Sequence, residues 1–286
     1  MATNFKAELT GCFGRPVAEN PTGVMQEAAF RAMGLDWRYL TIEVPPERLG
    51  DAMRGARAFG MRGLNLTIPH KVAVMEHLDA IAPDAAMIGA VNTVRFDNGK
   101  LTGENTDGKG FLRGIRQDAG VDPKGKRVVV LGAGGAARAV VTELALAGAA
   151  EIEVVNRSVE RGAAMVADLR AKTGAAIRFT PWEGVHRVDR EAGLLVNATS
   201  IGLFPDIDAA PPVDLSDASE SLLVSDAVFN PPETRLLDAA RRRGLPTLDG
   251  LSMLVYQGVI GCEIWTGKTP PEDVMKAALR AALGLH

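Results

Sequence analysis

A glycine-rich segment in the middle of the chain places the strongest constraint on the fold. An apolar run at 127–131 precedes this segment, and a helical pattern at 138–146 follows it. This order of strand, turn and helix is the context of a dinucleotide-binding fingerprint, in which glycines let backbone N–H groups approach a pyrophosphate. The candidate phosphate-binding residues are Gly132, Gly134, Gly135, Ala136 and Ala137. Because a long stretch of chain comes first, we expect two domains, with the chemistry outside the nucleotide fold.

The composition agrees with two folded domains and limits the partners. The chain has 286 residues, of which 47% are hydrophobic, and this is enough for two cores. Its net charge of −3 gives no basic field to attract nucleic acid or anionic lipid. We therefore expect a small-molecule substrate, no nucleic acid and no membrane, and a homodimer is one assembly that the sequence allows.

The ends of the chain and its cysteines narrow the class of protein further. No charged-then-apolar leader opens the sequence, and no run approaches the ~18 apolar residues of a membrane span. We expect a cytoplasmic location. Cys12 and Cys262 lie far apart in sequence, which favours buried packing over a disulfide or a metal site.

The first part of the chain predicts a mixed αβ domain. It opens with a βαβ unit and ends in a hairpin, whose turn at Asp97-Asn-Gly99 suits positive φ angles. The expected strands are 9–13, 37–44, 63–68, 90–96 and 101–105, and the expected helices are 24–33, 47–59 and 72–77.

The second part alternates strands and helices, which predicts a doubly wound parallel sheet. Expected strands are 128–131, 151–155, 176–179, 194–197, 222–226 and 247–249. Three helices are expected between them: one that follows the glycine-rich segment and ends at 147, one at 159–172, and one that ends near 243. Asn230 is expected to cap the last of these helices. Helices near 252–265 and 272–283 should return to the first domain. The predicted division is 1–107, 108–249 and 250–286, in an α/β fold with a Rossmann-like domain.

The residues at the end of the second strand of the nucleotide domain indicate which cofactor is bound. An acidic residue there is typical of NAD binding, and an arginine of NADP binding. Here the strand ends in Asn156, Arg157 and Ser158. A guanidinium can make paired hydrogen bonds to a 2′-phosphate, although Arg157 could instead form a surface ion pair. We expect NADP as the cofactor.

Two polar segments outside the nucleotide fold carry candidate chemistry. The segment 65–71 ends in Lys71, and Asp107 lies at the expected domain junction. A lysine can donate a proton to a ketone oxygen as hydride arrives, and a neighbouring carboxylate can orient it. A carboxylate favours the ammonium form and burial favours the neutral amine, so the sequence leaves the operating pKa open. On their own, these two residues would more often form a surface ion pair.

Taken together, the motifs resemble the shikimate dehydrogenase family over essentially the whole chain. The matching segments are 63–71 (GLNLTIPHK), 89–93 (GAVNT), 104–108 (ENTDG), 132–137 (GAGGAA), 156–158 (NRS), 197–202 (NATSIG) and 253–257 (MLVYQ). The resemblance implies NADP-linked interconversion of 3-dehydroshikimate and shikimate, or of a related ring acid. It implies a catalytic pair, Lys71 and Asp107. It further implies that Asn65, Thr67, Asn92 and Gln257 bind the hydroxyl groups of the substrate. Thr199 and Met253 are expected to line the cofactor site.

One segment departs from the family pattern. Members usually carry Ser-x-Ser-Pro after the first strand, and those hydroxyls hold the substrate carboxylate. This chain has Asn20 and Thr22 in their place. Both can still hydrogen-bond a ligand, so they are candidate substrate-binding residues of altered shape. Glu19 and Gln26 stand where the family usually has His.

Alternatives remain open for the function. A quinate or aminoshikimate-type dehydrogenase would use the same scaffold, and the pair Gln257-Gly258 is similar to the quinate/shikimate branch. A non-catalytic NADP-binding sensor or regulator would belong to another class, and the presence of Lys71 and Asp107 argues against it. A one-carbon folate dehydrogenase shares the two-domain plan but not the motifs at 104–108 and 253–257.

Overall fold

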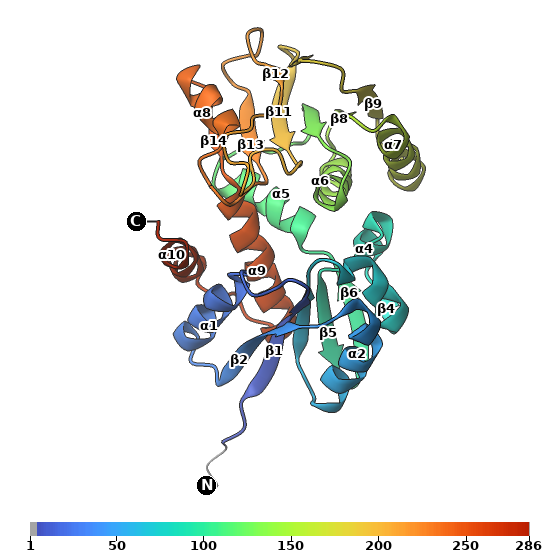
Figure 1. Cartoon of the computed structure of the whole chain (residues 1–286), viewed down its shortest axis with the longest axis vertical. Helices are drawn as coiled ribbons and strands as arrows, with labels where there is room; N and C mark the ends of the chain where they lie inside the picture. Colours follow the sequence, from blue (N-terminus) through green and yellow to red (C-terminus); the bar gives the residue numbers. More distant parts are fainter. Residues whose placement is uncertain (1–4, 286) are drawn as a thin grey trace. The chain divides into compact units, whose positions relative to one another are not determined.

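The computed structural model describes residues 5–285 and contains two compact units (Figure 1). The first, called here the substrate unit, comprises Met1–Thr106 with Val255–His286. The second, the nucleotide unit, comprises Asp107–Leu254. Each unit has its own six-stranded sheet and its own core. The expected division after 107 and after 249 differs from these limits by a few residues.

The sheet of the substrate unit is mixed. Its strands, in spatial order, are β2 (Trp37–Glu43), β1 (Glu8–Gly14), β3 (Gly63–Leu66), β5 (Thr93–Asp97), β6 (Lys100–Glu104) and β4 (Ala80–Ile81). β1 runs parallel to both β2 and β3, as a βαβ unit requires. β5 and β6 form the expected antiparallel hairpin. The carboxyl end of β3 therefore lies beside the start of β5, where Asn65 pairs with Thr93.

Helices cover both faces of this sheet. One face packs against α2 (Leu49–Ala58), η2 (Val74–His77) and α4 (Pro83–Ile88). The other face packs against α1 (Thr22–Ala32) and the later part of α9 (Gly250–Thr266), through Phe30, Cys262 and Trp265. The short helices η1 (Pro46–Arg48) and α3 (His70–Ala73) connect strands, and α10 (Glu272–Ala282) packs on α1.

The nucleotide unit is a doubly wound parallel sheet. Its strands, in spatial order, are β14 (Thr247–Leu248), β13 (Leu223–Asp226), β11 (Ala192–Asn197), β7 (Arg127–Leu131), β8 (Glu151–Asn156) and β9 (Ile177–Pro181). Because β7 comes first in the chain and pairs with both β8 and β11, the strand order reverses at β7. Doubly wound sheets bind ligands at such a switch point. The predicted α/β class with a Rossmann-like domain is confirmed.

Helices α5 (Asp107–Gln117), α6 (Gly135–Leu146) and α7 (Val159–Thr173) pack on one face of this sheet. The other face packs against α8 (Arg235–Arg242) and against the connecting segments around Trp182 and Leu215. The strand cores read as continuous apolar runs, such as Val128–Leu131, because both faces are covered. A two-stranded ribbon, β10 (His186–Arg187) and β12 (Val213–Asp214), stands apart.

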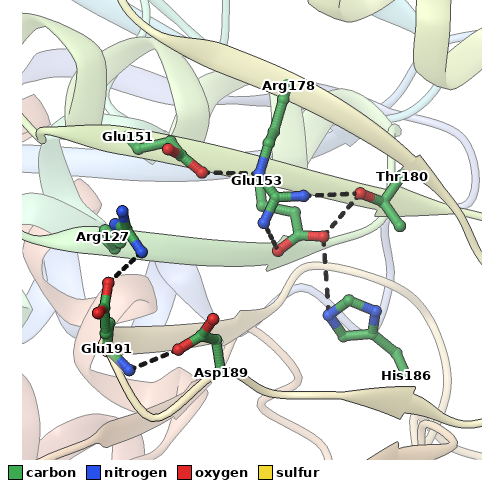
Figure 2. Close-up of polar contacts among 8 residues, drawn as sticks. All are labelled: Arg127, Glu151, Glu153, Arg178, Thr180, His186, Asp189 and Glu191. Carbon is green, nitrogen blue, oxygen red and sulfur yellow. Dashed lines mark hydrogen bonds and ion pairs between the residues drawn. The ribbon is translucent and has the colours of Figure 1, made fainter.

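A polar cluster ties β8 to β9 at the outer part of this sheet (Figure 2). The buried Glu153 carboxylate accepts hydrogen bonds from Arg178 Nη2 at 2.5 Å and from Thr180 Oγ1 at 2.6 Å. His186 lies 4.0 Å from the same carboxylate, and burial lowers its pKa. The cluster provides hydrogen-bond partners for a buried charge within the unit.

Several expected elements are corrected by the structure. Thr234, not Asn230, caps α8: its side chain accepts from Leu237 N at 3.4 Å. The helix expected at 47–59 is a 3-10 turn followed by α2, and the one expected at 72–77 begins at His70. Helices α4 and α5 were not expected from the sequence. Helix α4 has only 6 residues, and α5 contains several glycines, which have low helix propensity.

None of the helices within 5–285 has the length and hydropathy to cross a bilayer. Within the same residues, no group of three or more His, Cys, Asp or Glu side chains is arranged to hold a metal ion.

Candidate functional site

The glycine-rich loop lies at the switch point of the nucleotide unit. Gly132 has φ of +110°, and its N–H donates to Val155 O at 2.8 Å. A Cβ atom on Gly132 would lie 2.9 Å from Ala198 O and 3.0 Å from Thr199 Cγ2. Only glycine fits this backbone angle and this close approach. The loop after β7 therefore packs directly against the segment after β11, and two predicted cofactor residues, Gly132 and Thr199, are neighbours.

The other residues of the loop are open to a ligand. A Cβ atom on Gly134 or Gly135 would have no neighbour within 4 Å, so there is open space beside both glycines. Ala136 is exposed, whereas Ala137 is buried in the core and anchors α6. The first N–H groups of α6 have no partner within a helix, so the exposed turn presents donors of the kind that bind anions.

Hydrogen bonds hold Thr199 in place against this loop. Its hydroxyl donates to Asn197 Oδ1 at 2.7 Å, and Asn197 Nδ2 donates to Asp226 Oδ1 at 2.9 Å. Asp226 also accepts from Val228 N at 2.9 Å and from Thr234 Oγ1 at 2.7 Å. Burial still raises the pKa of Asp226, because desolvation exceeds the effect of these hydrogen bonds.

The three residues after β8 have different local roles. Asn156 Nδ2 donates to Ser158 O at 2.8 Å and so closes the turn. The Ser158 hydroxyl accepts from Arg161 N at 3.4 Å and caps α7. Arg157 is exposed and forms no ion pair or hydrogen bond with any residue from 5 to 285. Its guanidinium is therefore available at the edge of the strand where a 2′-phosphate would be recognised.

The backbone position of Lys71 is fixed by hydrogen bonds between its helix, α3, and two neighbouring segments. It is the second residue of α3, and its carbonyl oxygen accepts from Val91 N at 2.7 Å. The preceding residue, His70, is buried, and its Nε2 lies 2.7 Å from Val44 O. These two contacts fasten α3 to both neighbouring loops while the Lys71 side chain remains half-exposed.

Asp107 begins α5, where a carboxylate is favoured by the helix dipole. The next residue explains the position of this helix. A Cβ on Gly108 would overlap the carbonyl oxygen of Ala139, so α5 and α6 touch backbone to backbone. Lys71 and Asp107 belong to different units, and their predicted pairing stays a prediction.

Asn65 is held by a hydrogen-bond network that includes one other predicted substrate residue, Asn92. Its Oδ1 accepts from the Tyr39 hydroxyl at 2.8 Å. Its Nδ2 donates to Asn92 O at 3.2 Å and to Thr93 Oγ1 at 3.0 Å. Thr67, the next candidate along, begins the loop after β3: its N–H donates to Phe13 O at 3.0 Å.

Asn92 is joined to the same network from the other side. Its Oδ1 accepts from Thr106 N at 2.7 Å, and its Nδ2 donates to Thr106 Oγ1 at 3.0 Å. The hydroxyls of Thr106 and Thr93 are 3.2 Å apart. The structure therefore brings Asn65 and Asn92 together and links them to the residue directly before Asp107.

The replaced serine positions form a local turn at the start of α1. Asn20 Oδ1 accepts from Thr22 N at 2.9 Å, and Asn20 Nδ2 points toward Cys12 Sγ at 3.8 Å. Thr22 is buried, and its hydroxyl makes no hydrogen bond within the described chain. Glu19 is exposed beside this turn. The Oδ1 atom of Asn20 is thus occupied within the turn, and an anionic side chain, Glu19, is nearby.

Gln257 is buried in α9, and its neighbour Gly258 contacts α1: Gln26 Nε2 donates to Gly258 O at 2.8 Å. Met253 packs against the core of the nucleotide unit, in the first turns of the same helix. The predicted Met253 and Gln257 therefore fall in different units, although they are on one helix.

Four residues that support the predicted site were not expected from the sequence: Tyr39, Thr93, Thr106 and the capping residue Thr234. Thr93 and Thr106 stand inside segments that the motifs already include. Tyr39 is a buried aromatic in a strand, and no local pattern distinguishes it from a core residue.

Comparison with known proteins identifies the class. Three family profiles match: the shikimate dehydrogenase substrate binding domain over residues 12–94, shikimate / quinate 5-dehydrogenase over 115–202, and the shikimate 5′-dehydrogenase C-terminal domain over 250–280. A curated shikimate dehydrogenase (NADP(+)) from Methanopyrus kandleri is 46% identical over 281 residues, covering 98% of this chain and 97% of its own. This chain belongs to the shikimate dehydrogenase family.

Solved structures of family members agree with this assignment. A shikimate dehydrogenase in complex with NADP+ is 39% identical, with a TM-score of 0.90 over 98% of this chain and 97% of its own. The ligand-free 5-ketofructose reductase of Gluconobacter sp. strain CHM43 is 48% identical, with a TM-score of 0.93 over 97% of this chain and 99% of its own. The family fold is therefore shared with enzymes described as acting on different substrates.

Proposed function

We propose that this chain is an NADP-dependent oxidoreductase that interconverts 3-dehydroshikimate and shikimate by hydride transfer. The observation that carries the proposal is the joint presence of an open phosphate loop with a free Arg157 and a hydroxyl-binding network around Asn65 and Asn92. The curated NADP-linked relative from Methanopyrus kandleri supports both the cofactor and the reaction. The non-catalytic sensor is disfavoured, because Lys71 and Asp107 are both retained.

In this mechanism, each residue of the chain has one task. NADPH, when bound at the switch point of the nucleotide unit, supplies the hydride. Lys71 Nζ donates a proton to the ketone oxygen and takes it back in the reverse direction. Asp107 orients the ammonium group. Asn65, Thr67, Asn92 and Gln257 bind ring hydroxyls and position the reacting carbon.

Replacement of Lys71 by methionine tests the mechanism. We expect kcat to fall by roughly 10²–10⁴, the usual contribution of a positioned acid/base, while shikimate still binds. Stopped-flow or steady-state absorbance at the nicotinamide band measures kcat, and calorimetry measures binding. Lys100→Met, at an exposed hairpin position, is the control. A Lys71→Met enzyme with kcat within threefold of wild type would refute the assigned role.

A second candidate substrate is a neutral polyhydroxy ketone such as 5-ketofructose. The turn at Asn20 favours it, because a larger amide and a threonine with an additional methyl group replace the two serines, and the exposed Glu19 is the neighbouring residue. A carboxylate only accepts hydrogen bonds, and it would be placed near the Glu19 anion. The 48% identical 5-ketofructose reductase supports this candidate. Quinate and aminoshikimate remain further alternatives on the same scaffold.

Relative kcat/KM values decide between these substrates. The substrates are shikimate, quinate and an amino analogue in the oxidative direction, and 3-dehydroshikimate and 5-ketofructose with NADPH. Shikimate dehydrogenase activity requires 3-dehydroshikimate to have the highest kcat/KM of the reductive pair. The double variant Asn20→Ser with Thr22→Ser should raise kcat/KM for 3-dehydroshikimate by about tenfold and lower that for 5-ketofructose, because the first change replaces the larger amide by a hydroxyl donor and the second removes the methyl group of Thr22.

We also propose a cytoplasmic homodimer with the substrate unit and the nucleotide unit as its functional domains. Strand β2 is the edge of its sheet and carries the partly exposed Leu40 and Ile42, which supports pairing with a second copy. Light scattering after gel filtration measures the mass. A monomer of about 30.2 kDa at micromolar concentration would contradict the dimer.

A further inference from the structure

The hydrogen bonds of Asn65 determine which way its amide faces. A backbone carbonyl can only accept, so the atom that lies 3.2 Å from Asn92 O must be the nitrogen, Nδ2. The oxygen, Oδ1, then lies on the other side, 2.8 Å from the Tyr39 hydroxyl. Tyr39 must therefore be the donor in this bond.

This arrangement uses up the donors of Asn65. One N–H goes to Asn92 O and the other to Thr93 Oγ1, at 3.0 Å. Oδ1 has two lone pairs and accepts one bond from the protein, so one lone pair remains. Asn65 keeps 6% of its surface exposed, and its remaining hydrogen-bonding capacity is that of an acceptor.

The surroundings of Tyr39 keep its hydroxyl protonated and in place. The side chain is buried, and its ring packs at a tilt against Trp265, with centroids 6.3 Å apart. Burial raises the pKa of Tyr39 well above its usual value, and the neighbouring Cys12 raises it further. Burial likewise raises the pKa of Cys12 to about 12, so the thiol stays neutral. A neutral thiol is a weak acceptor, so it does not displace Asn65 from the tyrosine proton.

We propose that Tyr39 is a positioning residue: it holds Asn65 so that the amide meets the substrate only as an acceptor from a ring or chain hydroxyl. This inference rests on the proposed function, because it requires a hydroxylated substrate at Asn65. It applies equally to shikimate and to a neutral polyhydroxy ketone, since both carry hydroxyl donors. The network continues from Thr93 to Thr106, so Asn65 and Asn92 are positioned together.

A double-mutant cycle on kcat/KM tests the proposal. The four enzymes are wild type, Tyr39→Phe, Asn65→Ala and the double variant, assayed with the best substrate of the activity panel. We expect Tyr39→Phe to lower kcat/KM by about tenfold, mainly through KM, because a loosened Asn65 binds the hydroxyl poorly. In the Asn65→Ala background the same change should have less than a twofold effect.

Matched controls separate positioning from a general loss of structure. Tyr256→Phe removes another buried tyrosine hydroxyl, which lies 2.9 Å from Lys276 Nζ, and should leave kcat/KM within twofold. The KM for NADP should not change in any variant, because the nucleotide unit has a separate core. If Tyr39→Phe fails to fold, Thr93→Val removes another contact of Asn65 and takes its place in the cycle.

The outcomes are distinct. Losses that add in the double variant, or a Tyr39→Phe enzyme within twofold of wild type, would overturn the positioning role. Absence of wild-type turnover with every hydroxylated substrate would overturn the proposed function instead. In that case the same four proteins are loaded with NADP and titrated calorimetrically with shikimate and with 5-ketofructose. The double-mutant cycle is then calculated from the binding affinities, and the same non-additivity is expected.

Discussion

At the scale of single residues, we propose that Arg157 selects NADP over NAD. It is exposed, has no partner within 5–285, and follows β8 where the adenosine ribose is recognised in doubly wound folds. Loss of a charged hydrogen-bonding group costs about 1.5–3 kcal/mol, which is roughly ten- to a hundredfold in affinity. We expect Arg157→Ala to raise KM for NADPH by that factor.

The KM for NADH is the internal control for this variant. NADH has no 2′-phosphate, so its KM should stay within twofold, and steady-state assays with both cofactors measure the ratio. An Arg157→Ala enzyme that keeps the wild-type ratio of NADPH to NADH use would show that another residue selects the phosphate.

A second residue-scale prediction concerns the pH dependence of stability. Burial raises the pKa of Asp226 in the folded protein above its value in the unfolded chain, near 3.9. The folded state therefore keeps this proton at a pH where the unfolded state has lost it. The stabilisation from protonated Asp226 is complete below about pH 4 and is lost as the pH rises through the folded pKa.

Asp226→Asn removes this titration. We expect the difference in free energy of unfolding, wild type minus variant, to become smaller as the pH rises above 4. Urea unfolding at closely spaced pH values measures it. A difference that is constant with pH would mean that Asp226 has the same pKa in both states.

At the scale of elements, glycines of the nucleotide unit have two different purposes. Gly108 allows α5 to contact α6, because a Cβ there would overlap Ala139 O. Gly134 has open space around it and lies at the N-cap of α6. Packing requires the first glycine, and we propose that the second lets a ligand approach the backbone.

The matched variants Gly108→Ala and Gly134→Ala separate these purposes. We expect Gly108→Ala to lower the free energy of unfolding by about 1–3 kcal/mol, the usual cost of overpacking. Gly134→Ala should fold normally and bind NADPH more weakly. Urea unfolding and NADPH fluorescence titration measure the two effects, and the reverse assignment would contradict the geometry.

At the scale of the whole molecule, the two units differ in how the chain builds them. Both cores of the nucleotide unit are formed entirely within Asp107–Leu254. The substrate unit needs the C-terminal segment: Trp265 Nε1 donates to Val94 O at 3.1 Å, and its ring occupies the space above Gly63.

We therefore expect a fragment of residues 107–254 to fold alone and to bind NADPH, whereas a fragment of residues 1–106 does not fold. Circular dichroism, cooperative urea unfolding and NADPH titration of the two fragments check this. A cooperative transition in the 1–106 fragment would show that α9 and α10 add less to this core than the contacts indicate.

The local features of this protein could be predicted from sequence. The strand, glycine turn and helix at 127–146 form a continuous signal, and Arg157 follows the next strand at a fixed place. The order of strands and helices predicts the doubly wound sheet. The helix cap was predicted at the wrong residue. Asn230 has the right residue type, but Thr234 makes the hydrogen bond, because Pro231 and Pro232 each disfavour helical backbone at the residue before them.

The sequence by itself determined the class of chemistry, because phosphate loops, acid/base residues and hydroxyl-binding amides are recognised by residue type within short segments. Only the tertiary structure decided that both N–H groups of Asn65 are used within the protein and that its remaining capacity is that of an acceptor. That property depends on Tyr39, Asn92 and Thr93, which lie 26 to 28 positions away and meet Asn65 only when the sheet forms. The direction of a hydrogen bond depends on which partners surround the amide, and chain folding alone brings those partners together.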